Sequence, residues 1–386
     1  MSETSVKDIP LRVVSVRAHA HRAPLLRPFI TAQRSTASVD YVVVDCEVES
    51  PSGERVVGQG SAAETVAVTG EDCASILRCV RSALSPALTG ERGSIHQLDA
   101  RAAAAAGTGA SSASAAVSVA LFDAWSRLTN QPLAAVLASR GGWPEPERAM
   151  VNDMTISLQA PDTMAEEARA AAAQGEQILK IKLGSDPEED RQRLQAVVDA
   201  APGVRLRLDA NQGWSADDAI TIIRRFDADG LPIDLIEQPC PADDLDGMAR
   251  VTAATQIPIM ADESIWTAAD AQRVIDARAA DLLNIKLAKS GSISEAIAIA
   301  DAAHTAGVPC MVGAMMEPRI SITAAAHLAC AHPAITMIDL DSPQWFAEQV
   351  PTGGYTVTNG VLNLAGGPGL GLNPLSPREQ PLDDHP

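Results

Sequence analysis

Aromatic residues, basic residues and long apolar segments are all scarce in this chain of 386 residues. Aromatics make up 3% of the sequence and hydrophobic residues 46%, so Ala, Val, Leu and Ile must fill the core. Acidic residues outnumber Lys and Arg by 49 to 30, and the net charge of −19 argues against a nucleic-acid or anionic-membrane partner, because a phosphate backbone would be repelled. No uninterrupted apolar segment approaches the roughly 20 residues that a membrane-spanning helix needs.

Cysteine is also infrequent, and its spacing indicates no site. Six cysteines are scattered without a CxxC pair or a paired metal-ligand spacing. Most of them lie in apolar segments, which favours buried reduced thiols over disulfides. The first ten residues, MSETSVKDIP, are polar and lack the apolar stretch of a signal peptide. We therefore expect a cytoplasmic protein.

The chain divides by its residue pattern into three parts. Residues 1–140 alternate like strands at first and then become helical and Ala-rich, which predicts an α+β domain. The turn residues at the start of residues 141–352 mark a domain boundary, and short apolar strands then alternate with helical stretches. Residues 353–386 contain a hairpin-like segment that we expect to return to the first domain.

Strand-like segments recur at even intervals in the middle part. They end near Leu158, Lys182, Asp209, Glu237, Asp262, Lys286, Gly313 and Asp341. From Lys182 onward, successive ends are separated by 24 to 28 residues. Eight βα units of that length predict an α/β fold with a closed parallel, TIM-like (β/α)8 barrel. A doubly wound sheet also alternates β and α segments, but rarely with such even spacing.

Three carboxylates end three consecutive predicted strands. Asp209 follows VRLRL, Glu237 follows IDLI, and Asp262 follows IPIMA. Functional side chains of a parallel barrel gather at the carboxyl ends of its strands, so these acids should meet. Acids that close repel one another unless a cation lies between them, and ligands that are all oxygen suit Mg²⁺. The simpler explanation, that each acid caps the following helix, suits one acid better than three in successive units.

Lysines flank the three acids. Lys180 and Lys182 lie in LKIKL, where strand alternation places both side chains on one face. Like charges so close should lower the proton affinity of each amine and make it a usable base. Lys286 ends the strand that follows Asp262, so Lys182 and Lys286 should face each other across the barrel mouth. A single lysine at a strand end is usually a solvated surface charge, but two around a carboxylate cluster indicate an acid/base pair.

These motifs together resemble the muconate-lactonizing subgroup of the enolase superfamily. The resemblance rests on LKIKL, on DANQGW from Asp209, on IEQP around Glu237, on MADES around Asp262 and on NIKLAKSG around Lys286. It implies a modified (β/α)7β barrel whose capping domain is built from the N-terminal part and the C-terminal tail. It also implies one Mg²⁺ per chain, for which Mn²⁺ can substitute, and a homo-oligomer. Asn211 and Glu263 would contact the metal ligands without binding the metal ion themselves.

The resemblance further implies a two-base proton transfer. The substrate carboxylate would bind the metal ion, which stabilises the enediolate that forms when the α-proton leaves. Lys182 would take the proton from one face of the α-carbon and Lys286 would return one to the other face. Lys180 would tune Lys182 and touch the substrate carboxylate.

A further motif separates the activities of the subgroup. Asp339 and Asp341 lie in IDLDSP, which resembles the DxD motif of dipeptide epimerases such as those acting on L-Ala-D/L-Glu. Two carboxylates at i and i+2 on one face could hold the free ammonium group that a dipeptide carries. The alternatives within the subgroup are an N-acyl (N-succinyl) amino acid racemase, an o-succinylbenzoate synthase and a muconate cycloisomerase. In the simplest explanation, one of these acids caps a loop.

Two more residues are expected to select the substrate. Arg34 in RPFITAQRS resembles an arginine that pairs with the glutamate side chain of Ala-Glu dipeptides, although an exposed loop arginine is nearly as good an explanation. Met315 in GAMMEPR follows the seventh strand, where no histidine stands; this argues against the mandelate-racemase subgroup and its His base. Relatives often read GxGE where this chain reads Gly58-Gln59-Gly60-Ser61, so their specificity transfers less safely. His304, His327 and His332 are expected to be structural.

Two other classes of function remain open. Barrel lysines can form imines, so a Schiff-base lyase is one alternative. A non-catalytic metal-binding or structural protein that kept the fold is another, because a fold does not guarantee a function.

Overall fold

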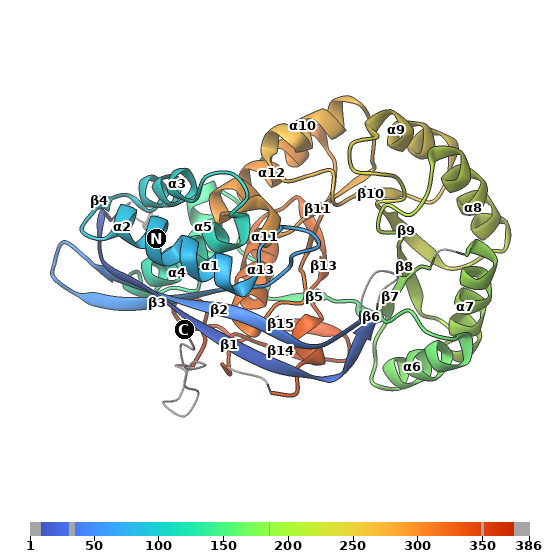
Figure 1. The fold of residues 1–386 in the computed structure, drawn as a ribbon, viewed down its shortest axis with the longest axis horizontal. Helices are drawn as coiled ribbons and strands as arrows, with labels where there is room; N and C mark the ends of the chain where they lie inside the picture. Colours follow the sequence, from blue (N-terminus) through green and yellow to red (C-terminus); the bar gives the residue numbers. More distant parts are fainter. Residues whose placement is uncertain (1–8, 31–34, 185, 349–350, 374–386) are drawn as a thin grey trace.

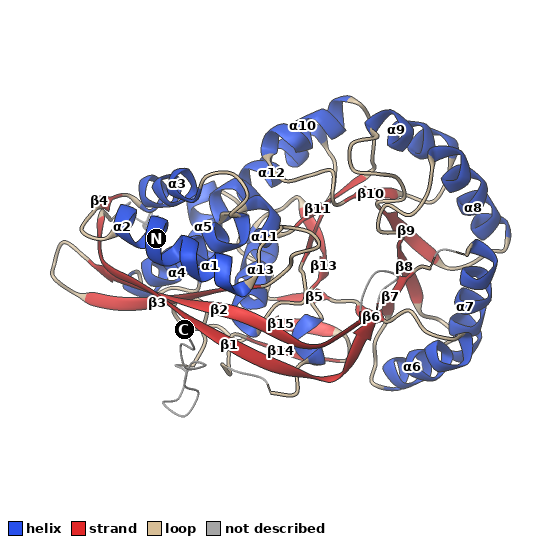
Figure 2. Ribbon diagram, in the orientation of Figure 1, coloured by secondary structure: helices blue, strands red, loops and turns tan. Residues whose placement is uncertain are grey.

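The computed structural model describes residues 9–30, 35–184, 186–348 and 351–373. In these residues an antiparallel sheet of four strands, ordered β3-β2-β1-β4, lies beside a parallel sheet of eight strands, ordered β13-β12-β11-β10-β9-β8-β7-β6 (Figure 1). Figure 2 shows the strands of this parallel sheet arranged around a common centre with helices on the outside. The predicted α/β barrel beside an α+β capping domain is confirmed.

Long antiparallel strands and a central helix form the capping domain. Its strands are β1 (Leu11–Ile30), β2 (Ser35–Glu49), β3 (Arg55–Ala63) and β4 (Arg92–Gly93). Its helices are α1 (Cys73–Cys79), η1 (Val80–Leu84), α2 (Ser85–Leu88), α3 (Ile95–Ala106), α4 (Ser111–Leu128) and α5 (Leu133–Gly141). Helix α4 packs directly on β3 because Gly58 and Gly60 have no side chain: a Cβ there would lie 2.1 Å from Ala120 O and 1.9 Å from Ala116 O.

The barrel consists of short strands that are each followed by a helix, except the last, and β11 is followed by two helices. The strands are β6 (Met154–Ile156), β7 (Ile178–Lys182), β8 (Arg205–Asp209), β9 (Ile233–Glu237), β10 (Ile259–Ala261), β11 (Leu282–Ile285), β12 (Cys310–Gly313) and β13 (Ile335–Asp339). The helices are α6 (Pro161–Ala173), α7 (Pro187–Ala200), α8 (Ala216–Ala228), α9 (Leu245–Ala254), α10 (Ala268–Asp276), α11 (Leu287–Ser290), α12 (Ile293–Ala306) and α13 (Arg319–Ala331). Polar caps begin several of these helices: Ser215 accepts a hydrogen bond from Asp218 N, and Asp244 accepts one from Gly247 N.

The first and the eighth barrel strands are joined by side chains instead of a backbone ladder. In the described residues β6 and β13 are the two ends of the sheet order, with no strand pairing between them. Leu340 N donates to Asn152 Oδ1 at 2.9 Å, and Thr155 N donates to Asp341 Oδ2 at 2.7 Å. Arg207, from β8, reaches across the interior and donates to Ile338 O at 2.7 Å. These contacts close the barrel.

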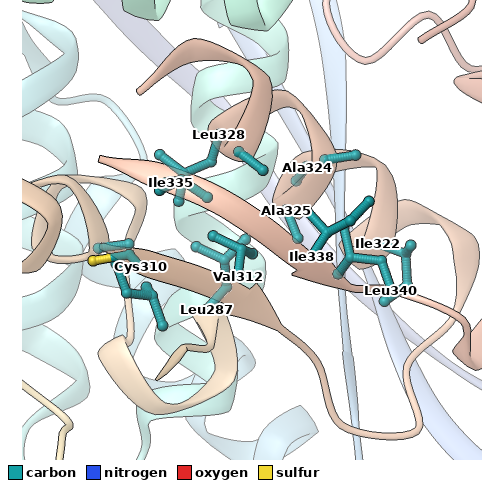
Figure 3. Close-up of a cluster of buried hydrophobic side chains, with 14 of the residues drawn as sticks. Leu287, Cys310, Val312, Ile322, Ala324, Ala325, Leu328, Ile335, Ile338 and Leu340 are labelled. Atoms are coloured by element: carbon teal, nitrogen blue, oxygen red, sulfur yellow. The ribbon is translucent and has the colours of Figure 1, made fainter. Parts of the chain in front are cut away.

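The core continues from the barrel into the capping domain. Figure 3 shows part of it, where Cys310 and Val312 of β12, Ile338 of β13, and Leu328 of α13 pack together. Aliphatic side chains fill this space, as the composition predicts. All six cysteines lie in described residues, and none of them is paired in a disulfide.

The C-terminal hairpin pairs with the barrel segment, and the chain after it contacts the capping domain. Strands β14 (Tyr355–Thr358) and β15 (Val361–Leu364) form a three-stranded sheet with β5 (Ala149–Val151). Beyond them, Leu370 N donates to Asp123 Oδ1 of α4 at 2.8 Å. None of the helices in the described part of the chain has the length and apolar character to cross a membrane.

Candidate active site

The three strand-end acids lie side by side at the carboxyl end of the barrel. Asp209 and Glu237 are the last residues of β8 and β9 and are paired in the strand register, while Asp262 directly follows β10. Their exposed fractions are 1%, 1% and 3%. Three neighbouring strands therefore bring three buried carboxylates to one place.

Lysine ammonium groups lie between the carboxylates. Lys180 Nζ is 3.2 Å from Asp209 Oδ2 and 2.6 Å from Glu237 Oε2. Lys286 Nζ is 2.7 Å from Asp262 Oδ2 and 3.7 Å from Glu237 Oε1. Each acid thus shares a lysine with its neighbour.

Lys182 and Lys286 lie at opposite ends of this row of acids. Lys182, the last residue of β7, donates to Asp209 Oδ2 at 2.5 Å. Lys286 follows β11 and contacts Asp262, at the other end of the row, with Glu237 between. The two amines thus approach the acids from different sides of the barrel mouth.

The prediction that neighbouring lysines lower each other's proton affinity is wrong for Lys180. Burial lowers the pKa of Lys180, but the charges of Asp339, Glu237 and Asp209 outweigh burial and raise this pKa well above its usual value. Burial also lowers the pKa of Lys286, yet Asp262 and Glu237 raise it overall. The sequence pattern shows only that Lys182 is two residues away from Lys180. It does not show that three carboxylates lie within 3.2 Å of Lys180 Nζ.

The pKa values of two of the three acids are lowered. Burial raises the pKa of Asp209, but Lys182 and Lys180 lower it below its usual range. The pKa of Asp262 is also lowered, because Lys286 and Lys289 outweigh its burial. Glu237 keeps a raised pKa through burial and the charge of Asp209.

The donor chemistry of this cluster fits a divalent cation. Carboxylate oxygens are the ligands that Mg²⁺ prefers, and three come from adjacent strand ends. Within the residues that the structure describes, no three acidic, His or Cys side chains are already gathered as a metal cage; ammonium groups occupy the space between the acids. Glu263 Oε2, beside the cluster, is buried without a hydrogen-bond partner. Asp209, Glu237 and Asp262 are therefore the residues that could hold the cation.

Sequence reasoning missed two polar residues that hold these acids. Asn284 Nδ2 of β11 donates to Glu237 Oε1 at 2.8 Å. Lys289 Nζ contacts both Asp262 Oδ1 and the Asp262 carbonyl, because the short helix α11 turns its side chain back toward β10. Both lie in NIKLAKSG. The composition also carried a signal: the chain has only five lysines, and four of them meet at this site.

Asn211 and Glu263 have different surroundings. Asn211 N donates to Asp209 Oδ1 at 3.0 Å, from a residue whose φ of 44° turns the chain tightly after β8. Glu263 is partly buried, and burial together with the charges of Asp262 and Asp209 raises its pKa to about 7. Asn211 thus supports the cluster through its backbone.

Asp339 and Asp341 are both buried, with different partners. Asp339 Oδ2 accepts from Lys180 Nζ at 2.7 Å, and the lysines lower the pKa of Asp339 despite its burial. Asp341 Oδ2 accepts from Thr155 N and, at 3.2 Å, from Trp345 Nε1. Burial and the charge of Asp339 raise the pKa of Asp341.

The two other candidate substrate contacts are Arg34 and Met315. Arg34 lies outside the described residues. Met315 is partly exposed in the loop after β12, and its backbone N donates to Glu317 Oε1 at 3.0 Å. Ser61, where relatives often carry an acid, is buried and hydrogen-bonds Ser321 of α13, with 2.6 Å between the two hydroxyls.

His327 and His332 make their contacts away from the cluster. His327 Nδ1 accepts from Ala134 N at 3.1 Å, and His332 Nε2 lies 3.1 Å from Asp301 Oδ1. A cavity of about 690 Å³ lies at the opposite, amino-terminal end of the barrel and is lined by the starts of β7, β8 and β13. This cavity is remote from the strand ends that carry the acids and lysines.

Known proteins resemble nearly the whole chain. A model of the mandelate racemase / muconate lactonizing enzyme N-terminal domain matches residues 13–138, and an enolase C-terminal domain-like model matches residues 163–377. L-Ala-D/L-Glu epimerase of Bacillus subtilis is 39% identical over 94% of this chain and 97% of its own length. N-succinyl-L-Arg/Lys racemase of Bacillus cereus is 32% identical over 94% and 95%.

Solved structures agree with these sequence relatives. The substrate-liganded L-Ala-D/L-Glu epimerase from Bacillus subtilis superimposes with a TM-score of 0.88 at 38% identity, covering 95% of this chain and 99% of that one. A dipeptide epimerase from Enterococcus faecalis, complexed with Mg and L-Leu-L-Tyr, gives a TM-score of 0.85 at 33% identity over 94% and 99%.

Proposed function

The chain belongs to the mandelate racemase/muconate lactonizing enzyme family of the enolase superfamily and is an isomerase, and we propose that it epimerises the α-carbon of the C-terminal residue of a dipeptide. L-Ala-D/L-Glu is the proposed substrate pair, after the relatives that carry that name.

One observation carries the proposal: two lysines flank a row of three buried acids from opposite sides. Inversion at a carbon needs a base on one face and an acid on the other. Lys182, on Asp209, and Lys286, on Asp262, lie at the two ends of the row. A substrate α-carbon held over the row would meet one amine on each face.

Lys182 and Lys286 each have one role in the proposed reaction. Lys182, once neutral, accepts the α-proton from one face and becomes an ammonium. Lys286, as an ammonium, gives a proton to the other face and becomes neutral. In the reverse direction the two exchange roles, so each turnover replaces the α-proton with one that comes from solvent through a lysine.

Asp209, Glu237 and Asp262 would hold a magnesium ion. When bound, the ion would supply a positive charge that neutralises the negative charge developing on the substrate carboxylate. Lys180, which touches Asp209 and Glu237, would reach the same carboxylate. Asn284 and Lys289 keep the acids in place through hydrogen bonds to Glu237 and Asp262.

The acids of the eighth strand favour a substrate with a free ammonium group. Asp339 and Asp341 are buried near the end of β13, and a cation that replaces part of their present contacts would be well matched to them. N-acylated amino acids carry no cation at this position. N-succinyl amino acids are the alternative substrate class, because one relative is named N-succinyl-L-Arg/Lys racemase.

The test is α-proton exchange in D₂O with Mg²⁺, using mixtures of dipeptides and of N-succinyl amino acids. Mass spectrometry detects the label, and NMR assigns its position. We expect one deuterium at the α-carbon of the C-terminal residue of dipeptides. Label at the N-terminal residue would contradict the proposed orientation, and exchange confined to N-succinyl amino acids would replace the proposal with the alternative.

Two variants give matched controls for the two-base arrangement. Lys182→Ala and Lys286→Ala should each abolish epimerisation, while each retains exchange with only one of the two epimers, because one base remains. A Schiff-base enzyme would instead be inactivated by borohydride in the presence of its carbonyl substrate. Exchange that survives in both variants with both epimers would refute the assignment.

A further inference from the structure

Trp345 connects the capping domain to the carboxylate of Asp341. The indole belongs to η2 (Ser342–Trp345), directly after Asp341, and is 2% exposed. Its Nε1–H donates to Asp341 Oδ2, the oxygen that also accepts from Thr155 N. One oxygen of this carboxylate is therefore in contact with the edge of the indole.

The capping domain packs against the same ring. The Phe29 ring of β1 meets the indole edge-to-face, with 5.0 Å between centroids and 88° between planes. The Arg27 guanidinium lies 4.6 Å from the indole centroid, and its Nη1 is 3.2 Å from Glu167 Oε1 of α6. An aromatic edge and a cation each stabilise the ring in this place.

Backbone contacts also join the residues after Trp345 to β1. Leu25 of β1 forms an isolated antiparallel bridge with Phe346, the residue after Trp345. Ala347 N donates to Pro24 O at 2.9 Å. The indole is thus fixed by its own chain, by β1 and by Asp341.

We infer that Trp345 is a specificity-determining residue that restricts the first residue of the dipeptide to a small side chain. The inference rests on the proposed function, in which Asp341 holds the substrate ammonium group. An ammonium nitrogen lies roughly 2.7–2.9 Å from the carboxylate oxygen that binds it and one bond from its α-carbon. The first side chain therefore begins beside the carboxylate that the indole contacts, and a large one must displace a ring that packs against Phe29 and Arg27.

The indole also donates a hydrogen bond to Asp341, and this effect can be separated from the effect of its size. Trp345→Phe keeps an aromatic side chain against Phe29 but removes the N–H donor and some volume. Trp345→Ala removes donor and ring together. The size discrimination should therefore fall in the order wild type, Phe variant, Ala variant, whereas both variants should raise the KM of a dipeptide with N-terminal alanine.

The experiment measures kcat/KM in the Mg²⁺-loaded protein for dipeptides that differ only at the first residue: Gly, Ala, Val and Leu. We expect the wild type to favour alanine over leucine by about 10-fold or more. The Phe variant should reduce this ratio, and the Ala variant should bring it close to one. Because the wild-type series is itself a test, the inference stays falsifiable even if the Ala variant does not fold.

Trp125 offers a matched control. It is a buried tryptophan of α4 that meets Phe122 edge-to-face and has Arg140 5.8 Å from its ring centroid. Trp125→Phe should leave the alanine-to-leucine ratio unchanged. Equal wild-type rates for alanine and leucine, or an unchanged ratio in Trp345→Phe, would overturn the inference while leaving the proposed function standing; the absence of turnover with every dipeptide would instead refute the proposed function.

Discussion

Replacing Arg207 by Met should lower the free energy of unfolding far more than replacing Arg205, two residues earlier on the same strand. Arg207 is 4% exposed and donates from Nη1 to Asp153 Oδ2 and to Ile338 O, both at 2.7 Å. It thereby connects the chain just before β6 to β13, the two strands that share no ladder among the described residues. Arg207→Met leaves the fully buried Asp153 without its cation.

The magnitude follows from that burial. Breaking a buried ion pair by removing one partner costs about 3–5 kcal/mol, since the other charge stays buried and unpaired. Asp153 Oδ1 already has no hydrogen-bond partner, and burial raises the pKa of Asp153, so protonation of this carboxyl is the main way in which the loss of Arg207 can be compensated. Arg205 pairs with Asp234 at the surface, where its side chain is 66% exposed; Arg205→Met should therefore cost less than about 1 kcal/mol.

Urea unfolding followed by circular dichroism measures these costs. The cycle also includes Asp153→Asn and the double variant, in which no buried charge is left unpaired. The double variant should be less destabilised than the sum of the two single variants. A cost below about 1 kcal/mol for Arg207→Met, or single costs that add within about 0.5 kcal/mol, would refute the role of Arg207 in barrel closure.

Three further results are expected. Burial lowers the pKa of His327 from 6.5 to about 4, so between these values the unfolded chain binds a proton that the folded chain does not. About 3 kcal/mol of stability should then be lost as pH falls through this window, and urea unfolding of His327→Gln should lack this slope. Mg²⁺ at about 100 times its Kd should raise the free energy of unfolding by about 2.7 kcal/mol, and EDTA or Asp209→Asn should abolish this shift in thermal melts; an unchanged shift in the variant would exclude this metal site. Gly60→Ala places a Cβ 1.9 Å from Ala116 O, so it should lower the free energy of unfolding by about 1–3 kcal/mol, and an unaltered melting temperature would contradict the close packing of α4 on β3.

The sequence predicted the barrel and the position of its acids because both are local properties. A strand ends where apolar alternation ends, and Asp209 and Glu237 are indeed the last residues of β8 and β9. The even spacing of such ends predicts a closed parallel arrangement, in which all strand ends lie on one side. The alternation in LKIKL likewise places Lys180 and Lys182 on one face, and both contact Asp209.

The proton affinities could not be predicted in the same way. The pattern around Lys180 indicated a second lysine two residues away, but the nearest charges in the structure are Asp339, Glu237 and Asp209 from three other strands. Coulomb energy depends on distance in space, so carboxylates at a few ångströms outweigh a like charge along the chain. The direction of the pKa shift therefore reversed.

Local patterns in the sequence are therefore sufficient to predict the barrel, its strand ends and the acids and lysines that lie at them. The packing of the folded chain sets which side chains hold those groups in place: Asn284 on Glu237, Arg207 between β8 and β13, and Trp345 between Asp341 and the capping domain. Strand and helix periods encode which face a residue occupies. They do not encode which distant residue it meets, because that depends on how the closed barrel and the capping domain pack together.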